Sequence, residues 1–389
     1  MDNENDPFLK FFMHQNICYL DESLLVLFAD DFSKNKLRDY EAATSSLIIP
    51  LTFTSPSEEM NFISLIDLLS VACNFEKDCS ALNQNSLREV LIFGMISMIL
   101  SSKQLDSNMM VSMCERDIAE IFGIPTLSAD LAASSLGIHV ESRSKLMDYA
   151  EILNRTLVLS GRALIRKGYK DLSSMLQDLL SESRHIEDLC RIISSDLVSL
   201  DDRHFVTIQH AENTEKDEVL ELCFFNNVKR MIYDVLPIVQ KATNPSLHIP
   251  GLDQCSGALT SRAISSLFQL GILQLKSRRQ QSEGCSAEGN DPQQFGADIL
   301  SLNTLGIGDV VSIRTAAVVA CDRLCEAINS KLDASVASSI ESGNNDVGVT
   351  AQSATAKAHV TPMKLSLYLE SVCRTDMPCF WPSEGAEKW

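Results

Sequence analysis

Paired cysteines, basic clusters and long apolar runs are missing from this 389-residue sequence. Its twelve cysteines are scattered through apolar segments without a Cys-x-x-Cys pair, which favours reduced thiols in a core. Cys321 and Cys325 form one helical pair without a histidine nearby, and the seven histidines never fall at a metal-binding spacing. We therefore expect neither a metal site nor a cofactor.

Positive charge is scarce. Lys and Arg total 33 against 52 Asp and Glu, so the formal net charge is −19, and the one short basic run is 276–279. Binding along a nucleic-acid backbone needs clustered cations, so direct contact with DNA or RNA is disfavoured. A small nucleotide needs a single pocket rather than a basic face, and it stays compatible with this charge.

Apolar runs are short as well. The longest, residues 90–100, is too short to cross a bilayer and follows Arg88 and Glu89. Residues 1–6 are acidic, the opposite of a signal or transit peptide. We expect no membrane association and a cytoplasmic location, with a nuclear one as the alternative.

Helical periodicity dominates what is present. Hydrophobic residues make up 45% and charged residues 22%, which is ordinary for a folded domain. Leu146, Ala150, Leu153 and Leu157 recur every three or four residues in a pattern that predicts one long helix ending at Gly168. The other predicted helices are 22–33, 57–73, 86–101, 171–180, 225–241, 260–270, 311–330 and 363–372, with a short strand near 205–208. The expected fold class is all-α.

Two segments lose this periodicity and become polar, residues 276–296 and 333–358. Each lies between predicted helices rather than between blocks of different composition. We interpret them as flexible surface loops inside a single domain spanning 1–389.

Catalytic motifs are absent. Gly306-Ile307-Gly308 lacks the third glycine and the lysine of a phosphate-binding loop, and no nucleophile elbow occurs. The order of the segments is more informative than any one of them. The relevant stretches are 11–29, 61–69 with Asp67, 224–234, 257–262 followed by 267–273, 311–322 and 365–371.

Taken in order, these stretches resemble the queuosine salvage family, whose members hydrolyse the N-glycosidic bond of queuosine 5′-phosphate and release queuine for tRNA queuosine salvage. The segment Gly257-Ala258-Leu259-Thr260-Ser261-Arg262 is similar to the family's Phe-Ala-Asp-Tyr-Arg motif. The resemblance implies one mostly α-helical domain, similar to helix-hairpin-helix DNA glycosylases, and a small nucleotide substrate.

The resemblance also implies a substrate pocket, in which several family residues are replaced. The family's catalytic carboxylate falls on Thr260, and its stacking Phe falls on Ala258. Of the family's pocket residues, only Asp67 and Arg262 are retained. The late pocket positions, two Asp and a Trp in the family, are Ser366, Ser371 and Glu370 in this sequence.

A threonine hydroxyl cannot carry the negative charge that stabilises an oxocarbenium-like transition state, so catalysis is expected to be impaired. A relocated acid, Asp253 or Glu370, would restore it. Two alternatives stay open beside the hydrolase: a non-catalytic helical scaffold that binds a protein partner, and an N-glycosylase for a different nucleoside.

Overall fold

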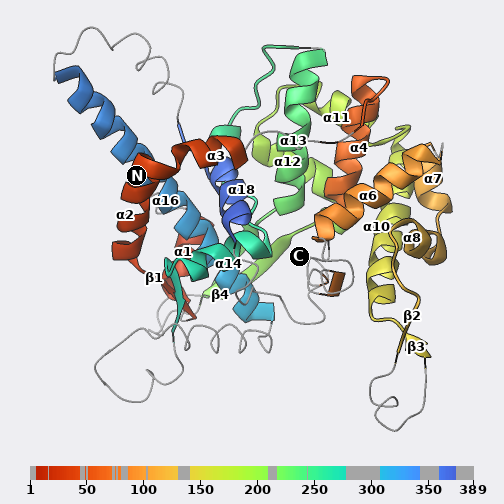
Figure 1. Ribbon diagram of the computed structural model, residues 1–389, viewed down its shortest axis with the longest axis horizontal. Helices are drawn as coiled ribbons and strands as arrows, with labels where there is room; N and C mark the ends of the chain where they lie inside the picture. The colour runs from red at the N-terminus through yellow and green to blue at the C-terminus, as the bar shows by residue number, and fades with distance from the viewer. Residues whose placement is uncertain are drawn as a thin grey trace. The chain divides into compact units, whose positions relative to one another are not determined.

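The structure is a computed structural model in which the chain gathers into two compact units (Figure 1). Unit 1 comprises Met1–Ser45, Arg203–Phe224 and Asp253–Ser383, and unit 2 comprises Ser46–Asp202, Phe225–Leu252 and Glu384–Trp389. The structure describes residues 6–15, 17–43, 49, 51–71, 75, 78–79, 86–101, 104–129, 141–208, 217–242, 244–276, 307–341 and 359–373.

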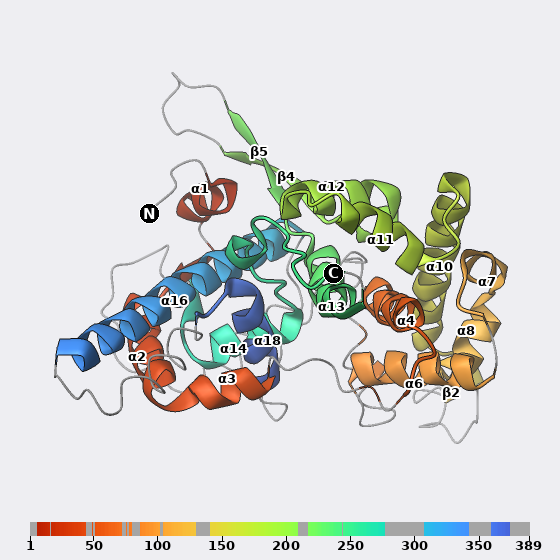
Figure 2. The same ribbon diagram turned by 90° about the horizontal axis from the view of Figure 1, so that it is seen from above.

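Unit 1 is built around one long helix. Its helices are α1 (Pro7–His14), α2 (Glu22–Asp31), α3 (Leu37–Ala43), α14 (Ser261–Gln269), α16 (Ile307–Glu341) and α18 (Pro362–Val372), with a π-helical turn η1 (Phe32–Lys36). Helix α16 packs against α1, α2, α14 and α18, so it forms the centre of this unit. Figure 2 shows α14 and α18 side by side next to it.

Short antiparallel ladders complete unit 1. Strand β1 (Cys18–Leu20) pairs with β6 (Leu273–Leu275), and Cys18 lies opposite Leu275. Strand β4 (Arg203–Ile208) pairs with β5 (Glu218–Cys223). The strand expected at 205–208 is therefore confirmed within β4, while β5 was not predicted.

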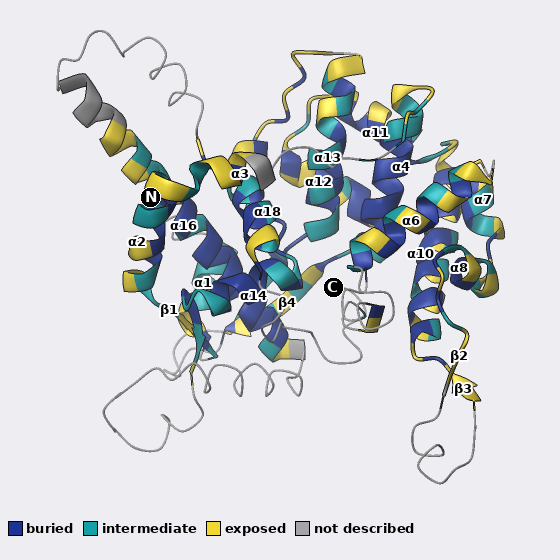
Figure 3. Cartoon of the chain, in the orientation of Figure 1, coloured by how far each residue is buried: buried dark blue, intermediate teal, exposed yellow. Residues whose placement is uncertain are grey.

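Unit 2 is organised around helix α4 (Pro56–Leu69), which packs against α6 (Leu87–Leu100), α10 (Leu146–Lys167), α11 (Leu172–Ser181) and α13 (Asn226–Ala242). Its ten residues from Met60 to Leu69 are all buried, and Figure 3 shows α4 dark blue along most of its length. Unit 2 also contains smaller elements: α7 (Ser107–Ser112), α8 (Glu115–Ile121), α12 (Ile186–Asp196), the turn η3 (Val198–Leu200) and the paired strands β2 (Leu127–Ala129) and β3 (Glu141–Arg143). The chain passes from unit 2 to unit 1 within the turn η4 (Leu252–Gln254).

Local signals explain most helix ends. Helix α10 ends at Gly168, whose φ of 82° is left-handed and suits glycine, as its sequence predicted. Ser86 and Glu89 form a reciprocal capping box at the start of α6. Asp171 caps α11, and Thr361 caps α18 in front of its first-turn proline.

Two helices differ clearly from their predicted bounds: α4 ends at Leu69 rather than residue 73, and α16 is longer at both ends than 311–330. Helix α16 runs to Glu341, so residues 333–341 are helical rather than the start of a loop. This stretch contains neither glycine nor proline, and it extends a helix that is already nucleated. The remainder of that expected loop, 342–358, and nearly all of the other, 277–296, lie outside the described residues.

The expected mostly α-helical class is confirmed for the described part of the chain, since strands there occur only as three two-stranded ladders. The likeness to helix-hairpin-helix glycosylases and the single-domain organisation stay predictions.

Candidate functional site

Asp67, a carboxylate that the queuosine salvage resemblance implies is retained, lies near the end of the buried helix α4 in unit 2. Its side chain is completely inaccessible to solvent. Every residue of α4 from Met60 onwards is buried, so no face of the helix could expose this carboxylate. A buried carboxylate requires partners, because isolated charge is strongly disfavoured in a low-dielectric interior.

Arg88 supplies the main partner. It lies in the first turn of α6, and its two terminal nitrogens reach different helices: Nη1 donates to Asp67 Oδ1 at 3.1 Å, and Nη2 donates to Asp234 Oδ2 at 3.0 Å on α13. Arg230, one turn before Asp234, places its Nε 3.7 Å from the same Asp234 oxygen. We call these four residues the Asp67 cluster; it joins α4, α6 and α13.

The Asp67 cluster changes the acidity of its buried member. Burial, followed by the charge of Asp234, raises the pKa of Asp67 from 3.8 to about 7, although Arg88 and Arg230 act in the opposite direction. Asp67 Oδ2 has no hydrogen-bond partner among the described residues. A protonated carboxyl with its proton on Oδ2 fits this arrangement, since Oδ1 already accepts from Arg88.

The cluster reaches solvent through its other members. The side chains of Arg88, Asp234 and Arg230 are 17%, 16% and 14% exposed. The Nε of Arg88 is buried and has no hydrogen-bond partner among the residues that the structure describes. The cluster thus combines a buried carboxyl with a pKa near neutrality and an unused, buried guanidinium donor, beside charged side chains that are slightly exposed.

The other expected pocket residues lie in unit 1, where α14 packs on α18. Thr260 is the N-cap of α14, and its hydroxyl accepts from the backbone N–H of Ala263 at 3.3 Å. Ala258 is 2% exposed. Arg262, in the first turn of α14, is half-buried.

The contact between these two helices is closed. A Cβ at Gly257 would lie 2.6 Å from the Pro362 carbonyl oxygen and 2.9 Å from Ser366 Cβ. Ser366 is buried, and its hydroxyl donates to the Met363 carbonyl inside α18. The fold thus brings Ser366 next to the segment of Ala258 and Thr260, as the family resemblance implies, but it packs them against each other.

The remaining candidates do not point to a shared site. Asp253 is exposed in the turn η4, and Glu370 is half-buried on α18. Ser371 is exposed, and its hydroxyl donates to the Tyr368 carbonyl. The sequence analysis identified Asp67 but did not identify Arg88, Arg230 or Asp234. The signal that could have found Asp234 is a charged residue at a core-facing position of the helix predicted at 225–241.

Three other kinds of feature bear on function in the described residues: groups that could bind a metal, helices that could span a membrane, and cysteines. No group of three or more His, Cys, Asp or Glu side chains is placed to hold a metal ion there. None of the helices described has the length and apolarity to cross a membrane. Six of the described cysteines are buried, which agrees with core positions.

Comparison with known proteins finds neither a family model nor a curated protein that matches this chain. The queuosine salvage resemblance therefore rests on the segments of the sequence alone.

Proposed function

We propose that the protein is a divergent member of the queuosine salvage family that hydrolyses the N-glycosidic bond of queuosine 5′-phosphate and releases queuine. Two features support this proposal: the order of similar segments along nearly the whole chain, and a mostly helical fold, which that family is expected to have. The reaction class is hydrolysis of an N-glycosyl bond without a cofactor.

The observation that carries the proposal is the acidity of Asp67. Breaking an N-glycosidic bond builds positive charge on the sugar and negative charge on the departing base. A carboxyl with a pKa of about 7 is present in both forms at neutral pH. It is therefore suited either to stabilise the sugar cation when ionised or to protonate the base when neutral.

The arginines of the Asp67 cluster support the same assignment. Arg88 holds Asp67 Oδ1 and leaves Oδ2 unused, which positions the carboxyl for proton transfer. Guanidinium groups bind phosphate through paired N–H donors, and the Arg88 side chain is 17% exposed. Arg88 would thus bind the 5′-phosphate, and a nucleotide would reach Asp67 only if the cluster opened.

A second candidate function is a non-catalytic scaffold that binds a protein partner. The closed contact between α14 and α18 favours it, because Ala258 and Ser366 are packed where the family has pocket residues. In this alternative the Asp67 cluster only joins three helices.

One assay distinguishes the hydrolase from the scaffold. Purified protein is incubated with queuosine 5′-phosphate, and the release of queuine is followed by mass spectrometry. We expect release by the wild type and a loss of at least a hundredfold in Asp67→Asn, which keeps the shape of the side chain but cannot exchange a proton. Asp21→Asn is the matched control, because Asp21 caps α2 in unit 1 and asparagine caps equally well. Other nucleoside 5′-monophosphates in parallel reveal a different base specificity.

Three results would contradict the proposal in different ways. Release that survives Asp67→Asn refutes the role of Asp67 but not the activity. Activity that appears only in Thr260→Asp, which retains the N-cap, places the lost chemistry at the start of α14. Absence of release from every variant refutes the hydrolase and leaves the scaffold.

A further inference from the structure

Helix α10 of unit 2 has an exposed stripe on the side that faces away from its packing contacts. Its buried residues recur every three or four positions, and the helix packs against α4, α7, α8 and η3. A second set of residues recurs at the same interval, half a helical turn away, and all of them are exposed. We call this set the α10 stripe; it consists of Asp148, Glu151, Arg155, Leu159, Arg162 and Arg166.

The charges of the α10 stripe are separated along the helix. Asp148 and Glu151 lie in the first two turns, and Arg162 and Arg166 lie in the last two. Leu159, which is 43% exposed, lies between the two ends. The helix dipole alone favours this order, because it stabilises acids near the N-terminus and cations near the C-terminus. The order of charge therefore indicates a partner only if the two ends also differ in how they are paired.

The two ends do differ. Arg143 pairs with Asp148 at 3.0 Å and with Glu151 at 3.5 Å, and more than half of each of these side chains is exposed. Exposed ion pairs contribute little to stability, so these acids can exchange their partner at low cost. Arg162 and Arg166, in contrast, form no ion pair with any residue that the structure describes.

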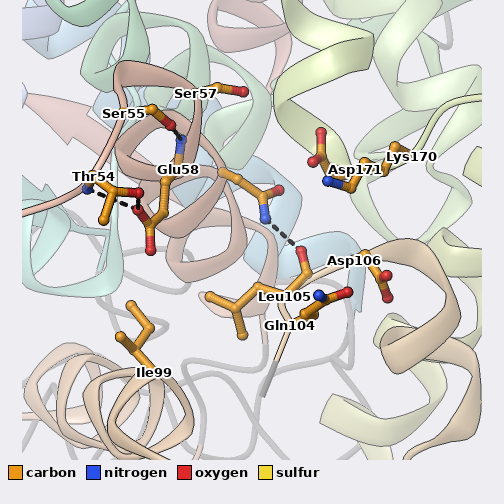
Figure 4. A pocket seen from close by; sticks show the side chains of 11 residues that line it. Thr54, Ser55, Ser57, Glu58, Ile99, Gln104, Leu105, Asp106, Lys170 and Asp171 are labelled. Atoms are coloured by element: carbon orange, nitrogen blue, oxygen red, sulfur yellow. Dashed lines mark hydrogen bonds between the residues drawn. The ribbon is translucent and has the colours of Figure 1, made fainter. Parts of the chain in front are cut away.

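Other cations near the end of α10 lie close to acids. Lys167 pairs with Asp196 at 2.6 Å. Lys170 lies beside Asp171 on the wall of a hollow whose lining also contains Glu58 (Figure 4). The formal net charge of the protein is −19, so carboxylates are plentiful on its surface. Two exposed arginines left without one indicate a surface that an acidic partner covers.

The acidic end of the same stripe on a second copy has the required charge. We consider two α10 helices that run antiparallel about a two-fold axis at the level of Leu157. Asp148 then lies opposite Arg166 of the second copy, and Glu151 lies opposite Arg162 of the second copy. The symmetry repeats both matches, so each basic end meets an acidic end. A parallel pair would bring like charges together instead.

The middle of the α10 stripe fits the same arrangement. Arg155 lies opposite Leu159 of the second copy, where the aliphatic part of the arginine side chain can cover the leucine. Ile165, which is 46% exposed, and the half-buried Val158 lie along one edge of the stripe and add apolar area. We propose that the α10 stripe is the contact surface of a homodimer with antiparallel α10 helices. This proposal is independent of the hydrolase function.

The size of the surface sets the strength that we expect. Helix α10 has 22 residues and is about 33 Å long and 10 Å wide. One side of it supplies only part of the roughly 800 Å² per partner of a standard interface. We therefore expect a reversible dimer with a Kd in the micromolar range, in which the charges set the orientation of the helices.

Analytical ultracentrifugation of the full chain, over concentrations up to about 100 µM, tests the proposal. Wild type should show a monomer–dimer equilibrium. The variant Arg162→Glu with Arg166→Glu makes both ends of the stripe acidic, and the variant Asp148→Lys with Glu151→Lys makes both ends basic. Each variant alone should dimerise at least tenfold more weakly than wild type. A mixture of the two should form a heterodimer within threefold of the wild-type affinity, because every end again meets the opposite charge.

The matched control is Arg38→Glu with Lys241→Glu, which makes the same change of net charge as the acidic variant at exposed residues on α3 and α13. Its dimerisation should stay within twofold of wild type. Equal weakening in the control and the acidic variant would show repulsion by net charge alone and would overturn the proposal. A wild type that is monomeric at every concentration would overturn it, as would two variants that dimerise normally alone or fail to associate with each other.

Discussion

The buried Asp67 carboxyl makes unit 2 less stable as the pH rises. Its pKa is about 7 in the folded protein against an ordinary value of 3.8. The folded state therefore binds more protons than the unfolded state between these values, so stability present below pH 4 is lost as the pH rises to 7. At about 1.4 kcal/mol per pKa unit, the full effect is about 4 kcal/mol.

The perturbation that isolates this effect is Asp67→Asn, which replaces the titrating group with a neutral one of the same shape. The relevant quantity is the stability of the variant minus that of wild type, because the titration of every other group cancels in this difference. We expect the difference to increase in favour of the variant by about 4 kcal/mol between pH 4 and pH 8.

Urea denaturation at several pH values measures the difference, and hydrogen exchange of the α4 amides assigns it to unit 2. Direct titration of the Asp67 carboxyl by NMR provides a second reading. A difference that stays constant within about 1 kcal/mol over this range, or one that changes in favour of wild type, would show that Asp67 remains ionised and that Arg88 outweighs its burial.

Three further predictions concern packing and capping. Arg88→Met should destabilise the protein by about 3 kcal/mol at pH 8, as for other broken buried ion pairs, and by less at pH 5, where Asp67 is protonated; an equal loss at both pH values would contradict the assigned acidity. Gly257→Ala should cost about 1–3 kcal/mol through overpacking, since its Cβ would meet the Pro362 carbonyl at 2.6 Å; unchanged thermal unfolding would refute the closed contact. Thr260→Val should cost about 1 kcal/mol while Thr260→Asp is nearly neutral, and equal stability of the two by denaturation would show that the cap contributes nothing.

Regular helices were predictable because their signals are local. The apolar period and Gly168 defined α10, and the helix expected at 260–270 is present as α14, with Thr260 as its N-cap. The end of α16 was mispredicted because serines in residues 333–341 gave the stretch a polar composition, although Leu332, Val336 and Ile340 continue a helical spacing of four residues.

The candidate site could be predicted only in part. Asp67 was identified by resemblance, but Arg88 lies 21 residues further along the chain on α6, and Asp234 lies another 146 residues beyond Arg88 on α13. Side chains so distant in sequence meet only through tertiary packing, which a single sequence does not record. The pKa of Asp67 depends on that packing, so the sequence could not indicate it.

The two units are interleaved along the chain, and this affects how the protein emerges from the ribosome. Helix α1 packs on α16, which is encoded roughly 300 residues later, so the first helix waits about 15 to 60 s for its partner at ordinary translation rates. Unit 2 likewise receives α13 only after β4 and β5 of unit 1 have been synthesised. Nascent chains arrested before residue 242 should therefore expose the apolar surface of α4 and recruit chaperones, and release should follow when α13 leaves the exit tunnel.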